Sequence, residues 1–555
     1  MITFSVAILT FLMIFLYIPG FYYPMVQEKE LVLAFFSIIT AIFNIFLIKT
    51  KKNHLDSHLI HVFILFSLFA VFNLFLNVSA DYFNFNDFTE FFFQVGFFIT
   101  FYIFFSYYNK SNDEKLLIIL FWFLFLLKIS VFFQYSGFFI VFEKMGRSGI
   151  TSTLGGVNFV SYFIYLSIII SAELFFILKK SKKEIINKKI LLLDIFYSVM
   201  LIGLLGTRSI ILALLFVFIS SIFKIKKSKK VFVFLLFIIL MGGFFNGFRK
   251  NIINESVFQR IYIWKNSSMQ FLKNPFFGIG AGNFKNAWFY YHENIFSPEK
   301  AVFLPENVNA MQSHNDFLQN LSEGGIVLLL ITLYLFKPIR KRTKWKFGFY
   351  FLTGFIFFAF FEFPLRIVSC SFITLILFSL YFKIEKKHSH LSNYNSSMIL
   401  LFILLILNIS GFFFMARKTI SDYYLTAGIK HADEITKIKM FEKSISLFKN
   451  GRSFYEAANI YFNQQETDKA FDYYAWALTY SAEPAIRETL GKIALKTGNY
   501  NQALIYFEDA WKRNPARFSL LYTIAEIYKK MDYDEKERYY YNLAEEIEKN
   551  YNNGG

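Results

Sequence analysis

The chain has 555 residues, of which 55% are hydrophobic and 79 are phenylalanine, and its mean hydropathy is +0.42. This composition excludes an ordinary soluble globular protein and indicates a polytopic membrane protein. The formal net charge of +18 would favour nucleic acid as a partner, unless membrane topology accounts for the placement of Lys and Arg. The single cysteine, Cys370, excludes an intramolecular disulfide and a cysteine-based metal site.

Thirteen apolar runs in the sequence are long enough to cross about 30 Å of hydrocarbon. The first, residues 2–19, has no basic residue before it and no small-residue cleavage pattern after it, so we expect a retained helix and not a signal peptide. The other runs lie near residues 30–48, 58–77, 90–108, 116–134, 158–178, 190–206, 209–223, 231–248, 316–336, 347–363, 365–382 and 398–416. The sequence therefore predicts an all-α fold with a transmembrane domain over residues 1–416.

Lys and Arg are concentrated in alternate loops between these runs. If the runs alternate across a membrane, the five most basic segments fall on one side, which the positive-inside rule identifies as cytoplasmic. These segments are residues 49–54, 179–189, 224–230, 337–346 and 383–390. The N-terminus is then cytoplasmic and the C-terminus extracytoplasmic. Because topology explains much of the basic excess, we expect membrane lipids around the chain and no nucleic-acid partner.

The longest polar interval between runs, residues 249–315, faces the extracytoplasmic side in this topology and contains Arg260 and His314. The short turn after the seventh run places Arg208 on the same side. Ionisable residues at the membrane edge are costly and commonly functional, so two arginines and a histidine facing one compartment indicate a site for an anionic substrate. The structural alternatives are an interfacial anchor for Arg208, a pair with Glu255 for Arg260, and a cap of the tenth run for His314.

A second turn on this side, between the eleventh and twelfth runs, carries Glu362 and Arg366 on either side of Pro364. We expect Glu362 to be a structural partner of Arg366, because the two opposite charges are close in the sequence. Arg366 is a candidate for substrate binding, and its alternative role is again an interfacial anchor.

Several patterns in the middle of the chain follow one another in a fixed order. They are STLGGVNFVSYF at 152–163 with Asn158 at a helix start, TRS at 207–209 after a glycine, R-x-x-x-W from Arg260 to Trp264, NPFFGIGAGNF at 274–284, HNDFLQNLSEGG at 314–325 and FFEFPL at 360–365. The glycines alone are not specific, since they lack the Lys-Ser/Thr of a phosphate loop. In order and spacing, residues 140–380 resemble the O-antigen ligase and O-antigen polymerase superfamily, which includes bacterial O-linked oligosaccharyltransferases.

The resemblance implies a metal-independent, GT-C-like glycosyltransferase in the bacterial inner membrane. It would transfer a glycan from an undecaprenyl-diphosphate carrier to an acceptor hydroxyl at the periplasmic face, in the biosynthesis of lipopolysaccharide or another cell-envelope polysaccharide. Arg208 and Arg260 suit a diphosphate, because guanidinium groups bind phosphate oxygens in a forked geometry. His314 suits a general base, or alternatively an imidazolium ligand of the diphosphate. We expect no cofactor and no metal ion, since no DxD-like or His-rich arrangement occurs in the outer loops.

Five further residues are expected to bind substrate, namely Asn315, Trp264, Gly280, Asn158 and Arg366. The acceptor is a glycan, a lipid A core or a protein, and the sequence leaves ligase, polymerase and protein oligosaccharyltransferase open because the three share the same donor chemistry. Two alternatives without catalysis also remain, a transporter of lipid-linked glycans and an assembly scaffold. A transporter would place charges in mid-membrane along its helices, and these runs contain few.

From residue 417 onward phenylalanine becomes rarer and charge rises, which indicates a second domain over residues 417–555. Five positions recur after 33 residues, near the 34 expected for tetratricopeptide repeats. These are Ala458, Tyr461, Ala470, Tyr474 and Ala477, followed by Gly491, Ala494, Ala503, Phe507 and Ala510. A degraded copy should follow and a partial helix pair should precede, at 432–450. We expect a periplasmic solenoid that binds a protein partner or positions the acceptor, or alternatively a stabilising cap.

Overall fold

The computed structural model describes residues 2–16, 27–51, 55, 57–107, 113–135, 157–181, 186–222, 252–292, 310–336, 339–341, 347–384 and 394–553. The helices of the membrane part are α1 (Ile2–Phe15), α2 (Gln27–Lys51), α3 (Ser57–Asn77), α4 (Phe85–Tyr107), α5 (Asp113–Tyr135), α6 (Val157–Ser181), α7 (Lys188–Leu205), α8 (Arg208–Ile222), α10 (Ile252–Lys273), α11 (Phe284–Tyr290), α12 (Asp316–Phe336), α13 (Gly348–Phe361), η7 (Pro364–Arg366) and α14 (Val368–Tyr381). The remaining helices are α15 (Tyr394–Lys430), α16 (Glu434–Leu447), α17 (Gly451–Asn463), α18 (Thr467–Tyr480), α19 (Pro484–Lys496), α20 (Tyr500–Arg513), α21 (Ser519–Lys530) and α22 (Asp534–Asn553).

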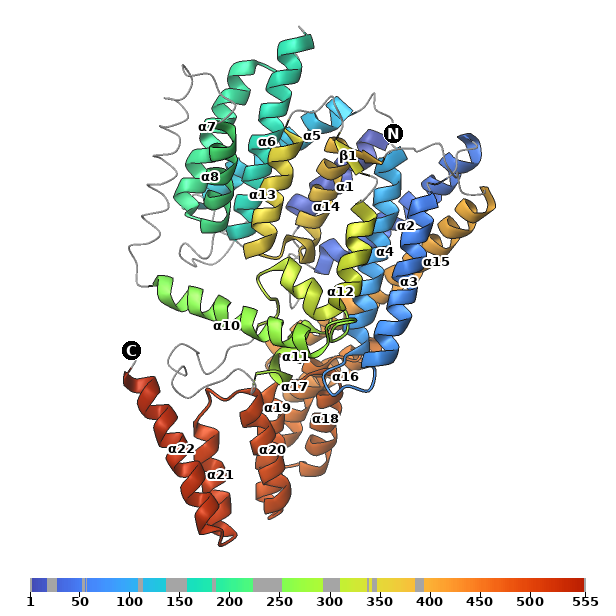
Figure 1. Cartoon of the computed structure of the whole chain (residues 1–555). Helices are drawn as coiled ribbons and strands as arrows, with labels where there is room; N and C mark the ends of the chain where they lie inside the picture. Colours follow the sequence, from blue (N-terminus) through green and yellow to red (C-terminus); the bar gives the residue numbers. More distant parts are fainter. Residues whose placement is uncertain are drawn as a thin grey trace.

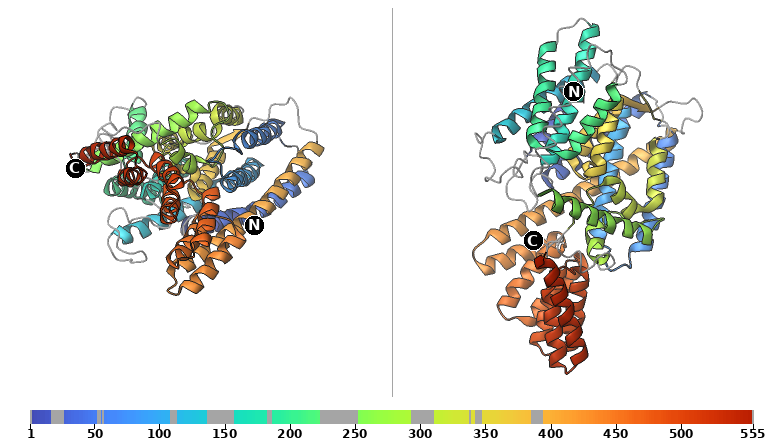
Figure 2. Two further views of the ribbon diagram at one scale, coloured as in Figure 1. Left: turned by 90° about the horizontal axis from the view of Figure 1, so that it is seen from below. Right: turned by 60° about the vertical axis from the view of Figure 1, so that its left-hand side comes forward.

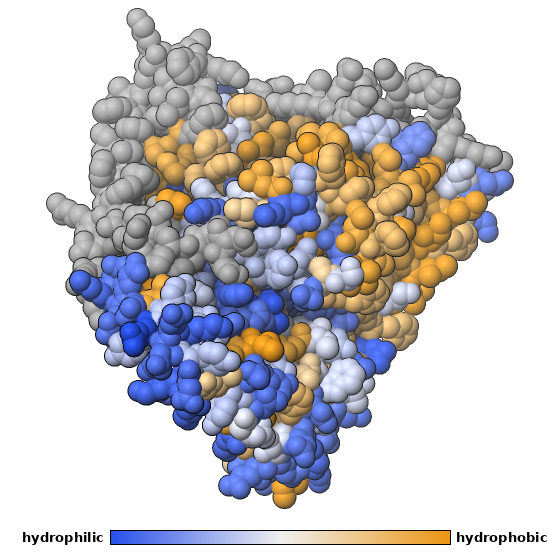
Figure 3. Space-filling model, turned by 60° about the horizontal axis from the view of Figure 1, so that its bottom comes forward, coloured by the Kyte–Doolittle hydropathy of each residue, from blue (hydrophilic) through white to orange (hydrophobic). Residues whose placement is uncertain are grey.

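The chain is an all-helical membrane protein, as predicted. Within the described residues, seven helices are long and apolar enough to cross a membrane, namely α2, α3, α4, α5, α6, α12 and α15. Shorter apolar helices correspond to the expected runs that begin at residues 2, 347 and 365. The expected run at 231–248 lies outside the described residues. Leucine, isoleucine and phenylalanine side chains remain exposed on the spans and colour this part of Figure 3 orange, as expected where lipid is the solvent.

The core of the membrane part is built around α6, which packs against α5, α7, α8 and α13. In its central window 72% of the residues are buried, more than in any other candidate span of the described chain. Aromatic side chains fill the contact with α13, where the rings of Tyr162 and Phe358 stack with centroids 4.6 Å apart. The hydroxyl of Tyr165 also donates to the carbonyl of Tyr350. These contacts hold α13 beside α6, so that the end of α13 lies near the start of α6.

A buried ion pair connects α5 and α7 inside this bundle. The ammonium of Lys128 bonds to Asp194 and donates to Ser167 at 2.8 Å and to Ser198 at 2.9 Å. Ser171 donates to the same carboxylate at 2.8 Å. Charged groups in a membrane are stable only when paired and turned towards the bundle interior, and this cluster meets both conditions.

Two three-residue strands form the only sheet among the described residues. Strand β1 (Ile339–Lys341) pairs antiparallel with β2 (Phe382–Ile384), and Arg340 lies opposite Lys383. Strand β1 lies in segment 337–346 and β2 includes the first two residues of segment 383–390, and the alternation of basic loops assigned both segments to one side of the membrane. Their pairing agrees with that assignment.

Helix α15 joins the membrane part to the C-terminal helices (Figures 1 and 2). It runs unbroken to Lys430, through the boundary expected at residue 416. Its last turns pack against α16, which takes the place of the helix pair expected at 432–450, and a Cβ on Gly428 would meet the ring of Phe441 at 2.5 Å. Helices α17 to α22 then form three antiparallel pairs, with the small and aromatic residues of the 33-residue repeat buried between them.

The repeat domain lies against one end of the membrane part, on the side of α10, α11 and the turn between α3 and α4 (Figure 1). In that turn, the side-chain amide of Asn84 donates to the carbonyl of Tyr480 at 2.9 Å, and in the first turn of α4 that of Asn86 donates to the carbonyl of Lys449 at 2.8 Å. Figure 3 shows the repeats as the mostly hydrophilic end of the molecule.

Candidate active site

Within the described residues of the polar interval 249–315, α10 occupies residues 252–273 and α11 occupies residues 284–290. Side chains four residues apart point to the same side of a helix, and two such pairs define two faces of α10 with different contacts. One carries Arg260 and Trp264 and is turned towards the end of α13. The other carries Tyr262 and Asn266 and is turned towards α11.

Glu362 is the centre of the site, directly after the end of α13. The Nη2 of Arg260 donates to its Oε1 at 2.7 Å, and the Nδ2 of Asn158 donates to the same oxygen at 2.7 Å. The Nδ1 of His314 faces its Oε2 at 3.4 Å. Only 2% of the Glu362 side chain is exposed, so this carboxylate is stabilised by the groups around it and not by water. Three of the predicted site residues thus meet at one carboxylate.

The predicted pairing of Glu362 with Arg366 is wrong. Arg366 instead donates from Nη2 to Glu323 at 2.8 Å and to Asn320 at 2.9 Å, both on α12. The 3-10 turn η7 is the cause, because its helical backbone sends the side chains on either side of Pro364 to different neighbours. Arg260 bonds to Glu362, and the side chain of Glu255, its alternative partner, lies outside the part of the chain that the structure describes.

His314 has an unusual backbone and a partly open side chain. Its φ of 51° lies in the left-handed region, which costs a residue other than glycine about 1 kcal/mol. Strained residues of this kind occur preferentially at functional sites. The ring contacts Phe363 edge-to-face at 5.1 Å, and 36% of the side chain is exposed. With Nδ1 turned to Glu362, the opposite nitrogen, Nε2, points away from the carboxylate and is suited to take a proton.

Trp264 and Asn315 hold the backbone on both sides of His314. The indole of Trp264 donates to the carbonyl of Ser313 at 3.1 Å and packs on the rings of Phe360 and Phe361. The side-chain oxygen of Asn315 accepts from the backbone of Leu318 at 2.9 Å and so caps the first turn of α12. The cap expected as the alternative role of His314 is therefore supplied by its neighbour.

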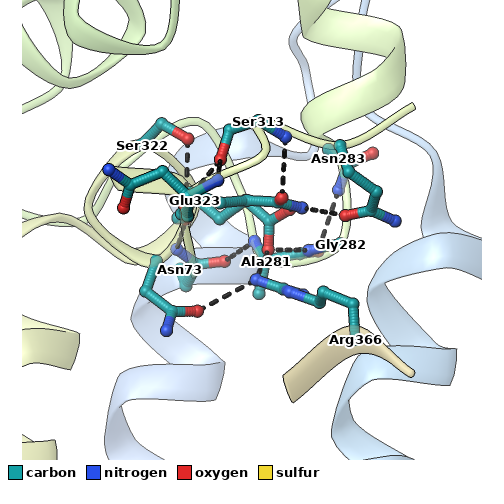
Figure 4. A network of polar contacts seen from close by, with 12 residues as sticks. Asn73, Ala281, Gly282, Asn283, Ser313, Ser322, Glu323 and Arg366 are labelled. Atoms are coloured by element: carbon teal, nitrogen blue, oxygen red, sulfur yellow. Dashed lines mark hydrogen bonds and ion pairs between the residues drawn. The ribbon is translucent and has the colours of Figure 1, made fainter. Parts of the chain in front are cut away.

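A second polar network, shown in Figure 4, surrounds Glu323, which is 1% exposed. One oxygen of this carboxylate accepts from Arg366 at 2.8 Å and from the backbone of Gly282 at 3.1 Å. The side chain of Asn73 accepts from the backbone of Ala281 at 3.0 Å. The network joins α3, the glycine-rich turn, α12 and η7. It therefore fixes the turn that also presents Glu362.

The glycine-rich turn at 278–282 serves close packing between backbones. All three of its glycines have positive φ, and a Cβ at Gly278 would come within 2.4 Å of the backbone of Glu323. A Cβ at Gly282 would come equally close to the carbonyl of Asp87. A Cβ at Gly280, a predicted substrate-binding residue, would come within 3.0 Å of the ring of Phe83. The structure thus places Gly280 with the network of Glu323 and not with the cluster around Glu362.

Arg208 is the first residue of α8 and follows Gly206, which ends α7 in the left-handed conformation. It is half-buried. Helix α7 returns along α6, whose first turn carries Asn158, and α8 packs along α13. Arg208 therefore lies at the same membrane side as Glu362.

The second face of α10 is connected to the repeat domain. The amide of Asn266 donates to the carbonyl of Trp288 at 3.1 Å, and the ring of Tyr262 packs on that of Trp288. The ring of His292 contacts both aromatic rings with centroids 5.2 Å away, and its Nδ1 bonds to the carbonyl of Arg513 in α20 at 3.0 Å. Helix α10 is therefore held between the Glu362 cluster on one face and α11 with the repeats on the other.

His292 stands in no motif of the sequence and was not predicted as a site residue. It is 1% exposed, and burial lowers its pKa to about 4, so it is neutral near pH 7. No group of three or more His, Cys, Asp or Glu side chains suited to a metal ion occurs within the described ranges.

Comparison with known proteins assigns the central part of the chain. Residues 194–333 match the family model described as O-antigen ligase. This segment includes Arg208, Arg260 and His314 and ends before Glu362. The match supports a membrane glycosyltransferase of the O-antigen ligase and polymerase superfamily.

The repeats have relatives of their own. Tetratricopeptide repeat protein 21B of Homo sapiens is 32% identical over 130 residues, which are 23% of this chain and only 10% of that protein. A solved structure of MamA from AMB-1 is 18% identical and covers 25% of this chain and 82% of that chain, with a TM-score of 0.22. A second MamA structure is 17% identical and covers 25% and 91%, also with a TM-score of 0.22. This chain is a predominantly helical membrane protein in which residues 194–333 match the O-antigen ligase family model, and its C-terminal part is built of helix pairs with a 33-residue repeat.

Proposed function

We propose that the protein transfers a glycan from an undecaprenyl-diphosphate carrier to an acceptor hydroxyl, in the manner of an O-antigen ligase. The observation that carries this proposal is the buried Glu362 carboxylate, which contacts both Arg260 and His314. A carboxylate that faces one ring nitrogen of a histidine sets the tautomer and stabilises the imidazolium when the other nitrogen takes a proton. The arrangement suits removal of a proton from a hydroxyl beside a bound anion.

In this mechanism the acceptor oxygen attacks the anomeric carbon of the donor sugar while the bond from that carbon to the diphosphate oxygen breaks. The hydroxyl proton passes to Nε2 of His314. Glu362 acts as a positioning residue, because it holds the ring through Nδ1 and balances the new positive charge. The diphosphate leaves with its electron pair and is stabilised by Arg208 and Arg260, whose guanidinium groups can each donate several hydrogen bonds.

Arg260 has the exposure that this role requires. Its side chain is 28% exposed, and the bonds to Glu362 and Phe361 occupy Nη2 and Nη1, whereas a guanidinium has five N–H donors. It can therefore remain bonded to Glu362 while it meets a phosphate oxygen. We include no metal ion, because fixed guanidinium groups supply the positive charge. Asn158, Trp264 and Asn315 then keep Glu362 and His314 in position.

The acceptor separates the candidate functions within the superfamily. A ligase uses a lipid A core, a polymerase uses a second glycan and a protein oligosaccharyltransferase uses a hydroxyl side chain, all with the same donor. Deletion of the gene in its host decides among them, because free lipid A core, short glycan chains or unmodified protein should accumulate, respectively. If none of the three accumulates, glycan transfer is not the function, and the protein is instead a transporter or a scaffold.

We further propose that the repeats recruit the acceptor or a protein partner on the periplasmic side of the inner membrane. Their contact with the α11 segment, next to the helix that carries Arg260, supports a place beside the reaction. A reporter that is active only outside the cytoplasm should be active when fused after residue 430 and inactive when fused at residue 342. The opposite pattern of reporter activity would show that the proposed topology is inverted.

The roles assigned to His314 are tested by donor binding and single-turnover transfer in purified wild type, His314→Ala and His314→Arg. A lost general base leaves donor binding nearly normal and slows transfer about 10²- to 10⁴-fold. If His314 is a charged diphosphate ligand, donor affinity falls and the Arg variant regains activity, which contradicts the base role. Strong inhibition by a chelator would contradict the metal-free mechanism.

A further inference from the structure

One corner of the repeat domain lies level with the ends of two membrane spans. This corner, residues 447–450, connects α16 to α17. The amide of Asn86, in the first turn of span α4, donates to the carbonyl of Lys449 at 2.8 Å. On the other side, Arg417 donates from α15 to the carbonyl of Leu447 at 3.2 Å, and Phe414 packs edge-to-face on Phe448 at 5.2 Å. The corner is thus attached where α4 begins and where the apolar part of α15 ends.

The side chains around this corner combine exposed aromatic rings with positive charge. Trp476 of α18 is 52% exposed, and the ammonium of Lys449 lies 5.7 Å from the centre of its ring. Phe85, the first residue of α4, is 58% exposed beside Asn86. One turn beyond Arg417, the exposed apolar stripe of α15 continues with Ile420. Trp476 belongs to the repeats, whereas Phe85 and Ile420 belong to α4 and α15, so an exposed ring of the repeats lies beside exposed apolar residues of two spans.

We propose that this corner is a membrane-interface anchor, in which Trp476 and Lys449 enter the lipid headgroup layer next to α4 and α15. Tryptophan is enriched at membrane interfaces because its ring is amphipathic, and lysine reaches lipid phosphates while its stem stays on apolar surface. The ammonium over the indole ring adds a cation–π contact. The anchor would hold the repeats at a fixed tilt to the membrane, independently of their contact with α11.

The position of the corner favours lipid over a soluble glycan or a protein. Phe85 is the first residue of the candidate span in α4, and its neighbour Asn86 donates a hydrogen bond to the carbonyl of Lys449. Trp476 is within reach of the same Lys449. A partner in the aqueous phase would need to displace lipid from this place.

The test uses nitroxide labels on the full chain in bilayers of phosphatidylethanolamine and phosphatidylglycerol. Trp476→Cys is the test position, Ile406→Cys in the middle of the apolar part of α15 is the lipid control and Tyr539→Cys on α22 is the water control, and the last two are 64% and 62% exposed. Cys370, the only native cysteine, is buried, and unmodified protein treated with the label gives its background. The measurement is the ratio of collisions with oxygen to collisions with a nickel chelate.

We expect the ratio at residue 476 to lie between those of the controls and severalfold above that at residue 539. A ratio equal to that at 539 would overturn the proposal and favour an aqueous glycan or protein partner for this surface. Bromolipid quenching of intrinsic fluorescence checks the result without a label. The fluorescence intensity lost on addition of bromolipid should be smaller in Trp476→Phe than in wild type. An equal loss in the two proteins would also overturn the anchor. Neither measurement depends on transferase activity.

Discussion

Replacement of Glu362 by Gln should slow transfer while the protein stays folded. The substitution keeps the size of the side chain and removes the charge that faces the Nδ1 of His314 at 3.4 Å. At an effective dielectric constant of about 20, a carboxylate and an imidazolium at that distance attract by about 5 kcal/mol. Because His314 is about one-third exposed, solvent screening reduces this to about 2 kcal/mol.

A loss of about 2 to 5 kcal/mol in the transition state corresponds to a rate about 30- to 5,000-fold slower. The assay is single-turnover transfer with saturating donor, accompanied by donor binding and thermal unfolding. Asn158→Ala is the matched control, because it removes one hydrogen bond from Glu362 and leaves both the charge and the contact with His314. It should slow transfer by no more than about tenfold.

A double-mutant cycle then separates a positioning role from a general loss of structure. If Glu362 acts through His314, the Gln variant should have little further effect in a His314→Ala background. Independent, additive effects of the two substitutions would refute this reasoning. A Gln variant with normal single-turnover rates would do the same.

Three further predictions concern the arginines, the interface with the repeats and the glycine-rich turn. Arg208→Lys and Arg260→Lys keep the charge but lose the fork, so transfer should fall strongly in both, and nearly normal turnover would reduce the arginines to membrane anchors. Because burial lowers the pKa of His292 to about 4, below the ordinary value of about 6.5, its contribution to stability is complete above about pH 6.5 and is lost as the pH falls towards 4. The midpoint temperature of thermal unfolding should therefore fall more steeply over this pH window in wild type than in His292→Gln. Identical pH profiles of the two proteins would contradict the lowered pKa of His292. Gly282→Ala should destabilise by several kcal/mol in denaturant unfolding, because its Cβ would meet the carbonyl of Asp87. Gly498→Ala, also at positive φ but with nothing within 4 Å, should cost only about 1 kcal/mol, and equal costs would show that backbone strain alone decides.

The sequence was sufficient to predict the helical architecture, because the constraints that lipid places on the backbone act within each segment. A backbone in lipid must satisfy its own hydrogen bonds, so long apolar runs predict helices without any knowledge of their neighbours. The repeats could be predicted for a similar reason, since each helix pair packs on the next through the same positions. Ala470, Tyr474 and Ala477 are all buried, as their recurrence in the sequence indicated.

The partners of the charged residues were decided only by the tertiary structure. Nearness in the sequence favoured a pair between Glu362 and Arg366, yet the turn between them directs Glu362 to Arg260, which is 102 positions away in the chain, and Arg366 to Glu323. The bond from His292 to Arg513 spans 221 positions and belongs to no periodic pattern. Hydropathy and helical spacing record which face of a helix is buried, whereas the choice among several possible counter-charges depends on how the helices are packed together.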